Sequence, residues 1–361
     1  STDVFNVAVG YYAGQQVTTG INNTLIGGVA GDALTSGTRN SVLGEGALGG
    51  DTQGSRNVAI GNVALASQNF TTATDAYNVG IGYASGISIT TGIRNTLLGG
   101  DVGDALTDAD FNVAMGYDAL SSDTLGSRST ALGYQALNAQ NFTTATDTYN
   151  TAVGFQAGLA VTTAVENTLI GSNAGDALTT GGLNVAVGFG ALTTEDTGTR
   201  NVAIGYEALE NQNSDTTNYN TAVGFQAGRN VTTAIYNTLI GGLAGDALTE
   251  GNNNTAVGLA ALTTDTLGDR NVALGVSALE QQNFTTSTDS YNVAVGYNVG
   301  FKITTGINNT LIGGLAGDAI TDADDNVAVG TLALSTNILG SKSVAIGKDA
   351  GYYLTNGDNN T

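Results

Sequence analysis

The chain has 361 residues, of which 53 are glycine and 41% are hydrophobic, and it contains no proline, cysteine, histidine or tryptophan. Its 31 acidic and 10 basic residues give a formal net charge of −21, which argues against a nucleic-acid partner because phosphate recognition needs clustered lysine and arginine. Disulfides are excluded, and no apolar run approaches membrane-spanning length, so we expect no membrane insertion by this segment.

A five-residue pattern repeats along the chain: asparagine, a β-branched or small residue, a small or apolar residue, an aliphatic residue, and glycine. It first begins at residue 6, and its last complete copy begins at residue 343. Most copies start 17 residues apart, and every fourth interval up to residue 292 is longer. Such self-similarity at a short period is the signature of a solenoid. We therefore predict an all-β fold, a parallel β-solenoid of about 20 coils that forms a single repeat array over residues 1–361.

Four successive coils make a larger repeat, here called a cassette, because the same departures from the pattern return about every 72 residues. The second coil carries GDAL or GDAI, the third ends in arginine or lysine, and the fourth carries an insert such as NFTTATDAY. The five cassettes are 6–77, 78–149, 150–219, 220–291 and 292–361.

Each five-residue motif is predicted to contain a short strand, in which successive side chains alternate between the two faces. The aliphatic fourth residue, such as Val9 or Ile204, is expected to fill the coil interior. The small third residue, such as Ala203, is expected to pack on the other face. A further aliphatic residue, at Val17 or Leu48, predicts a second strand in each coil.

The asparagine and the glycine of the motif are predicted to be structural. Asparagine side chains can hydrogen-bond the next coil and form a ladder, and glycine allows a corner with positive φ. The first members of this structural ladder are Asn6, Asn23, Asn40, Asn57, Gly10, Gly27, Gly44 and Gly61.

The inserts are predicted to carry aromatic contacts, because aromatic side chains on loops can stack on sugars. Inserts that plug the space between neighbouring chains are the alternative that we favour. The candidate receptor or inter-chain contacts are Phe70, Tyr77, Phe142, Tyr149, Tyr219, Phe284 and Tyr291.

The recurring acids and bases are predicted to be structural as well. One aspartate per cassette is too few for a calcium site, so we expect it to close a turn on local backbone amides. The basic residue that ends the third coil is expected to pair with acids at a rim or between chains. No catalytic, metal or cofactor site is predicted, because histidine and cysteine are absent and every carboxylate candidate recurs in each cassette. The aspartates are Asp32, Asp104, Asp176, Asp246 and Asp318, and the bases are Arg56, Arg128, Arg200, Arg270 and Lys342.

The segments NVAIG..AL, NTAVG.QAG and NVALG..AL resemble the head repeats of YadA-type trimeric autotransporter adhesins and the NxAxGxxAL repeats of bacteriophage tail fibres. The resemblance covers essentially the whole chain and implies a left-handed β-roll, a homotrimer and a structural or adhesive role. It also implies an extracellular, cell-surface or virion location, with a host-surface receptor or glycan as partner. The coils are longer than the usual adhesin repeat, so adhesin and phage fibre both stay open.

Small residues in the middle of the motif, such as Ala8 and Ala203, also predict trimerisation, because a partner chain would cover a thin core. We expect a shaft or head that holds a binding tip, cut from a longer fibre because both ends lie within repeats. An ice- or glycan-binding repeat protein is the alternative, and threonine pairs such as Thr18–Thr19 suggest the ice-binding form of it.

Overall fold

The computed structural model describes residues 4–361 and contains strands and turns, with no helix among those residues. The chain is a parallel β-solenoid of about 20 coils, as predicted, and the strand of one coil pairs with the strand about 17 residues later. Its internal contacts divide it into two compact units, Ser1–Thr180 and Gly181–Thr361. The division falls inside the third cassette.

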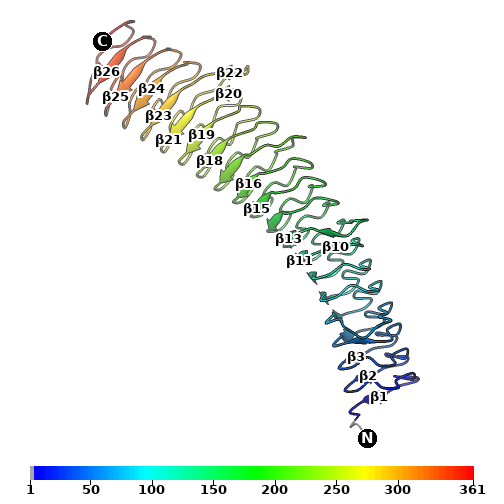
Figure 1. Cartoon of the computed structure of the whole chain (residues 1–361). Helices are drawn as coiled ribbons and strands as arrows, with labels where there is room; N and C mark the ends of the chain where they lie inside the picture. The colour runs from blue at the N-terminus through cyan, green and yellow to red at the C-terminus, as the bar shows by residue number, and fades with distance from the viewer. Residues whose placement is uncertain (1–3) are drawn as a thin grey trace. The chain divides into compact units, whose positions relative to one another are not determined.

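In the first unit every coil contributes one three-residue strand, and successive strands pair in parallel in chain order (Figure 1). Their bounds are β1 (Val7–Val9), β2 (Thr24–Ile26), β3 (Ser41–Leu43), β5 (Val58–Ile60), β7 (Val79–Ile81), β8 (Thr96–Leu98), β9 (Val113–Met115), β11 (Thr130–Leu132), β13 (Thr151–Val153) and β14 (Thr168–Ile170). Two-residue strands pair the third coil with the fourth in two cassettes, as β4 (Gly54–Ser55) with β6 (Thr74–Asp75) and β10 (Gly126–Ser127) with β12 (Thr146–Asp147).

The second unit has the same construction. Its strands are β15 (Val185–Val187), β16 (Val202–Ile204), β17 (Thr221–Val223), β18 (Thr238–Ile240), β19 (Thr255–Val257), β21 (Val272–Leu274), β23 (Val293–Val295), β24 (Thr310–Ile312), β25 (Val327–Val329) and β26 (Val344–Ile346). One further pair joins β20 (Gly268–Asp269) to β22 (Thr288–Asp289), and a single bridge joins Thr199 to Thr217.

The side chains of the strands point in the opposite directions from those predicted. In β16 the middle residue, Ala203, is fully buried, whereas Ile204 is 38% exposed. Leu25, in the middle of β2, is also buried. The expectation that Ile204 and its equivalents fill the coil interior is therefore wrong, and the middle residue is the one that points inward.

The interior of a coil is narrow, which explains why small residues suit the inward position. Where the middle residue is large, as at Leu25, the turn that follows carries Gly31, and a Cβ added there would lie 2.9 Å from Leu25 Cδ2. Where the middle residue is small, as at Ala203, the turn carries the fully buried Leu209. Leucine therefore enters the core from the strand in some coils and from the turn in others.

The second strand predicted in every coil does not form at Val17 or at Leu48, which both lie outside strands. Among the described residues, only third and fourth coils carry a second strand, two residues long, in three of the cassettes. In the corresponding stretch of the fourth coil, Val63 and Leu65 both have a φ of 52°, in the left-handed region. Residues in that conformation curl the backbone, whereas a strand needs successive extended residues.

The asparagines form a ladder within each unit. Asn6 Oδ1 accepts a hydrogen bond of 2.8 Å from the backbone amide of Asn23, and Asn23 Oδ1 accepts one of 3.0 Å from that of Asn40. The Asn23 side-chain amide also donates to the carbonyl of Gly37 at 2.8 Å. Each buried side chain thus ties its own coil and the next one together.

The glycine that follows each strand lies at a corner with positive φ. Gly10, Gly27, Gly44 and Gly61 have φ between 131° and 147°, a region that disfavours other residues. A Cβ at Gly10 would also lie 2.3 Å from the carbonyl oxygen of Gly27 in the next coil. The corner therefore requires glycine for two separate reasons.

Candidate interaction surface

The outward-facing aliphatic residues form a row along each unit, because strands stack in register from coil to coil. We call the fourth motif residues the outer row. In the pairs of β16 with β17 and β17 with β18, Ile204 lies next to Val223 and Val223 next to Ile240. The row presents apolar side chains to solvent, its more exposed members being Val9, Leu43, Leu98, Met115 and Ile170 in the first unit and Ile204, Ile240, Ile312 and Ile346 in the second.

A second exposed row, which was not predicted from the sequence, consists of residues that directly follow the corner glycine of the motif. We call it the aromatic row. In the first unit Tyr134 stacks between Tyr117 and Phe155, with ring centroids 6.0 and 5.4 Å apart. In the second unit Tyr206 stacks between Phe189 and Phe225, at 5.4 Å from each. The signal was present in the sequence, as the tyrosine or phenylalanine that follows the corner glycine in GYQAL, GFQAG and GYEAL.

The stacking limits what the aromatic row can bind. The planes of Tyr134 and Phe155 differ by 8°, so each ring covers a face of its neighbour. Sugars bind aromatic residues through an open ring face, and the central ring of each stack, Tyr134 or Tyr206, has a ring neighbour on both faces. Ring edges and the adjacent outer row suit packing against another apolar protein surface.

The predicted aromatic contacts of the inserts separate into two kinds. Phe70, Phe142 and Phe284 are buried within the coils, where they are not available to a partner. Tyr77, Tyr149, Tyr219 and Tyr291 are about half exposed. The structure thus brings only the tyrosines to the surface, and the phenylalanines belong to the core of their own chain.

Each insert tyrosine lies under the arginine that ends the coil before it. The Arg56 guanidinium lies 5.4 Å from the ring centroid of Tyr77, and its Nε is 2.8 Å from the Asp75 carboxylate. Arg128 and Arg270 repeat this arrangement. These arginines therefore pair with acids of their own chain, at an exposed corner where such pairs contribute little to stability.

A column of buried acids inside the coils was also missed. Asp51 occupies the inward position that Leu34 has one coil earlier. Its Oδ1 accepts hydrogen bonds from the amides of Gly54 and Phe70, at 3.0 and 3.1 Å, and its Oδ2 accepts one of 2.6 Å from the Gln68 side chain. Asp123, Glu195 and Asp265 repeat this role. The signal was an acid eleven places after the asparagine of the third coil, where the first two coils carry an aliphatic residue such as Leu34.

These acids fix the start of the insert to the coil before it. Because Asp51 binds the amide of Phe70, the chain leaves the coil at a defined point and the aromatic ring turns inward. Burial raises the pKa of Asp51 and of Asp265, while the glutamine and backbone donors oppose that rise. The arrangement is a structural clamp with no room for a substrate.

The GDAL aspartates are more varied than predicted. Asp176 accepts a hydrogen bond of 3.0 Å from Asn173, and Asp246 accepts one from Thr263. One carboxylate oxygen of Asp104 is buried without a hydrogen-bond partner, and desolvation followed by the nearby Asp101 and Asp118 raises its pKa. Within residues 4–361 no three acids, histidines or cysteines are arranged to hold a metal ion.

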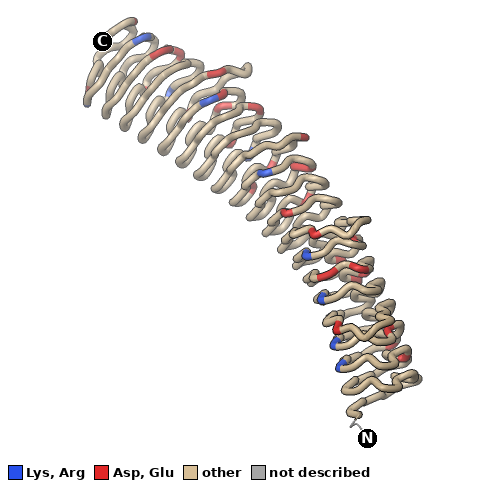
Figure 2. The backbone as a smooth tube through the Cα atoms, in the orientation of Figure 1, with Lys and Arg blue, Asp and Glu red and all other residues tan. Residues whose placement is uncertain are grey.

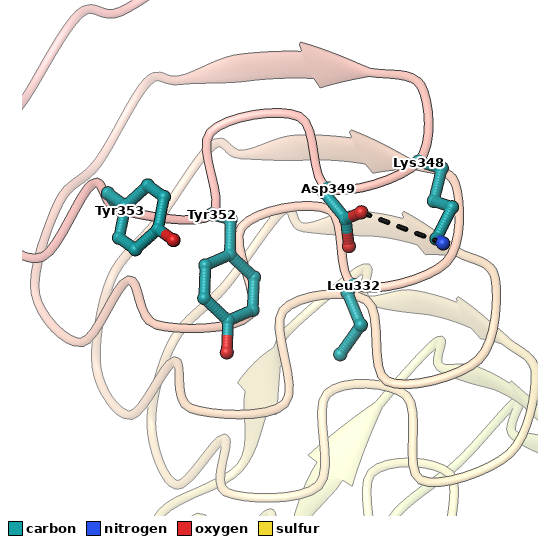
Figure 3. A pocket seen from close by; sticks show the side chains of 5 residues that line it. All are labelled: Leu332, Lys348, Asp349, Tyr352 and Tyr353. Atoms are coloured by element: carbon teal, nitrogen blue, oxygen red, sulfur yellow. Dashed lines mark ion pairs between the residues drawn. The ribbon is translucent and has the colours of Figure 1, made fainter.

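Acidic residues outnumber basic residues along the chain, as the red and blue positions in Figure 2 show. An open cleft of about 470 Å³ near residue 350 contains one of the few lysines (Figure 3). Lys348 faces Asp349 there at 3.8 Å, and Tyr352 and Tyr353 lie on the other side. The neighbouring carboxylate offsets the charge of the Lys348 ammonium, so the cleft carries no net positive charge.

Comparisons with known proteins return no match: no family model, no curated protein and no solved structure is significantly similar to this chain. Among the described residues there is no helix long and apolar enough to cross a membrane.

Proposed function

We propose that this chain is a structural or adhesive fibre segment, a shaft or head, of a trimeric surface adhesin or phage tail fibre. Three copies pack through the outer row and the aromatic row, in an extracellular, cell-surface or virion setting. The observation that carries the proposal is the exposure of the outer row on successive coils, with the aromatic row beside it over three coils in each unit. The resemblance of the repeats to adhesin heads and tail fibres supports the same role, and no catalytic activity is proposed.

A second copy is the partner that these rows fit best. Soluble proteins rarely leave long apolar stripes uncovered, and a repeated stripe matches the spacing of the same stripe on another copy. The charged residues cannot drive this association, because a net charge of −21 makes copies repel one another. Apolar burial must therefore outweigh the repulsion.

The test uses neighbouring residues that face opposite ways. Replacing the exposed Ile204 and Ile240 together with glutamate places charges in the outer row, and we expect a folded protein that no longer trimerises. Replacing the buried Ala203 with glutamate puts an unpaired charge in the core, and we expect the chain to unfold locally. Mass photometry and circular dichroism distinguish the two results. A parent protein that is monomeric at micromolar concentration contradicts the trimer.

The ice-binding alternative receives little support from the threonine pairs. Thr18 Oγ1 donates to the carbonyl of Thr35, and Thr90 and Thr91 both donate to Asp108. Hydroxyl groups engaged with the next coil are not a flat array that is open to ice. Absence of thermal hysteresis in the purified protein is the expected result.

A further inference from the structure

The third cassette differs from the others at its insert. Its fourth coil is two residues shorter than the other insert coils. Ser214 is the equivalent of Phe70, Phe142 and Phe284, since its backbone amide likewise donates to the buried acid of the preceding coil. That acid is Glu195, one methylene longer than the aspartates elsewhere. The side-chain amide of Asn218 donates to Glu195 at 3.0 Å and fills part of the space.

An open cleft of about 670 Å³ lies beside this shortened insert, within the unit Gly181–Thr361. Hydroxyl groups of Ser214, Thr216 and Thr233 line it, together with the carboxylates of Asp196 and Asp215. The volume lies within the range of small-molecule sites, which is roughly 300–1,000 Å³.

We propose that this cleft binds a neutral saccharide of one or two hexose units. Hydroxyl groups both donate and accept hydrogen bonds, and carboxylates accept them, so the lining matches the alternating hydroxyl groups of a sugar. Ile235, also in the lining, offers an apolar contact for sugar C–H groups. No lysine or arginine lines the cleft, and its two carboxylates disfavour anionic sugars.

Part of the lining is held in place before any ligand binds. Ser214 Oγ and Thr216 Oγ1 are 3.0 Å apart, and Thr197 Oγ1 donates to Asp215 Oδ1 at 3.1 Å. The backbone of Ser214 is itself fixed by Glu195. Groups that are already oriented lose less conformational entropy on binding.

The experiment titrates the full 361-residue protein with glucose, galactose, mannose, N-acetylglucosamine and the anionic sialic acid, observed by saturation-transfer NMR. We expect transfer to at least one neutral sugar and none to sialic acid. Ser214→Phe restores the residue of the other cassettes and removes the Ser214 hydroxyl group from the lining, so affinity should fall at least about tenfold. Asp215→Ala removes an exposed acceptor without disturbing the core, and a similar loss is expected.

The matched control is Thr285→Ala, which changes the residue equivalent to Asp215 in the fourth cassette and should leave binding unchanged. If Ser214→Phe lowers the melting temperature, Asp215→Ala decides the result. No transfer to any neutral sugar, full binding by Asp215→Ala, or binding only when calcium is added would each overturn the proposal. It rests on the proposed role as a binding fibre, but a failure here leaves the assembly state untouched, since that is measured by mass.

Discussion

At the scale of single residues, the corner glycine of each coil is constrained by the backbone of the next. A Cβ at Gly205 would lie 2.1 Å from the carbonyl oxygen of Gly224, and its φ is 142°. Gly205→Ala should therefore lower the free energy of unfolding by about 3 kcal/mol. Gly314→Ala is the matched control, because nothing lies within 4 Å of its added Cβ, and it should change stability by less than about 0.5 kcal/mol. Equal denaturation midpoints for both variants would contradict the corner geometry.

From Asn22 onward, the residue before each copy of the motif has a left-handed backbone conformation without being glycine. Leu183 has a φ of 64° and is 42% exposed, whereas Asn253 and Asn308 occupy the equivalent place in other coils. Asparagine tolerates this conformation better than leucine does. Leu183→Asn should therefore raise the free energy of unfolding by about 0.5 kcal/mol.

Leu259→Asn makes the same chemical change at an exposed residue whose φ is not positive, and it should give no gain. Denaturant titration of the two variants beside the parent measures the difference. A gain at both positions would show that the φ of Leu183 is not the cause.

The motif allowed the ladder residues to be predicted, because asparagine and glycine have specific backbone roles. The motif did not allow us to predict which face of the strand points into the coil interior. Alternation says that Ala203 and Ile204 lie on opposite faces, but not which face is inside. Hydrophobicity favoured Ile204 as the inward residue. Leu209 of the same coil already fills much of the interior, however, so that only a small residue such as Ala203 fits beside it.

At the scale of the element, the buried acid of each third coil controls the insert of the fourth. Burial raises the pKa of Asp265 above its usual 3.8. At pH values between the unfolded and the folded pKa of this carboxyl group, the folded protein therefore binds more protons than the unfolded protein. The stability from this group is fully present below pH 3.8 and is lost as pH rises through the folded pKa. Asp265→Asn removes this titration.

The melting temperature of Asp265→Asn, relative to the parent, should therefore increase from acid to neutral pH. Other titrating groups are common to both proteins and cancel in the difference. Asn337 shows that an amide is accommodated at this place, since its Oδ1 accepts the Gly340 amide at 2.8 Å. A difference that is independent of pH would mean that Asp265 does not titrate in this range.

The clamp explains why the inserts could be predicted only in part. Their position and aromatic content were visible in the sequence, but both aromatic residues were assigned to the surface. The hydrogen bond from the Phe284 amide to Asp265 turns that ring inward, and such a contact between coils 19 residues apart is not encoded by local pattern. Tyr291, beyond the clamp, stays exposed.

At the scale of the whole molecule, the cassette is the unit that can be removed. Deleting residues 78–149 joins Tyr77 to Asn150, which reproduces the junction of Tyr149 with Asn150, and melting should stay within a few degrees of the parent's. Deleting only residues 129–149 removes Gln140 and the insert that satisfy the buried Asp123. Loss of those partners should cost about 3 kcal/mol and unfold the neighbouring coils first.

Hydrogen exchange locates the loss of structure in these two deletions. The shorter deletion should lose protection around residues 113–127, and the longer one should show no such change. Similar behaviour of both would mean that coils, and not cassettes, are the cooperative unit.

The stacked rings of the aromatic row also have an optical consequence. Tyr134 lies face to face with Phe155, and Tyr206 with Phe225, in a chain that has no tryptophan to collect or mask tyrosine emission. Rings held parallel couple their electronic transitions, so the near-ultraviolet circular dichroism of these tyrosines depends on the coils staying in register. The protein thus contains its own spectroscopic reporters in each unit, which would register the separation of neighbouring coils without any added label.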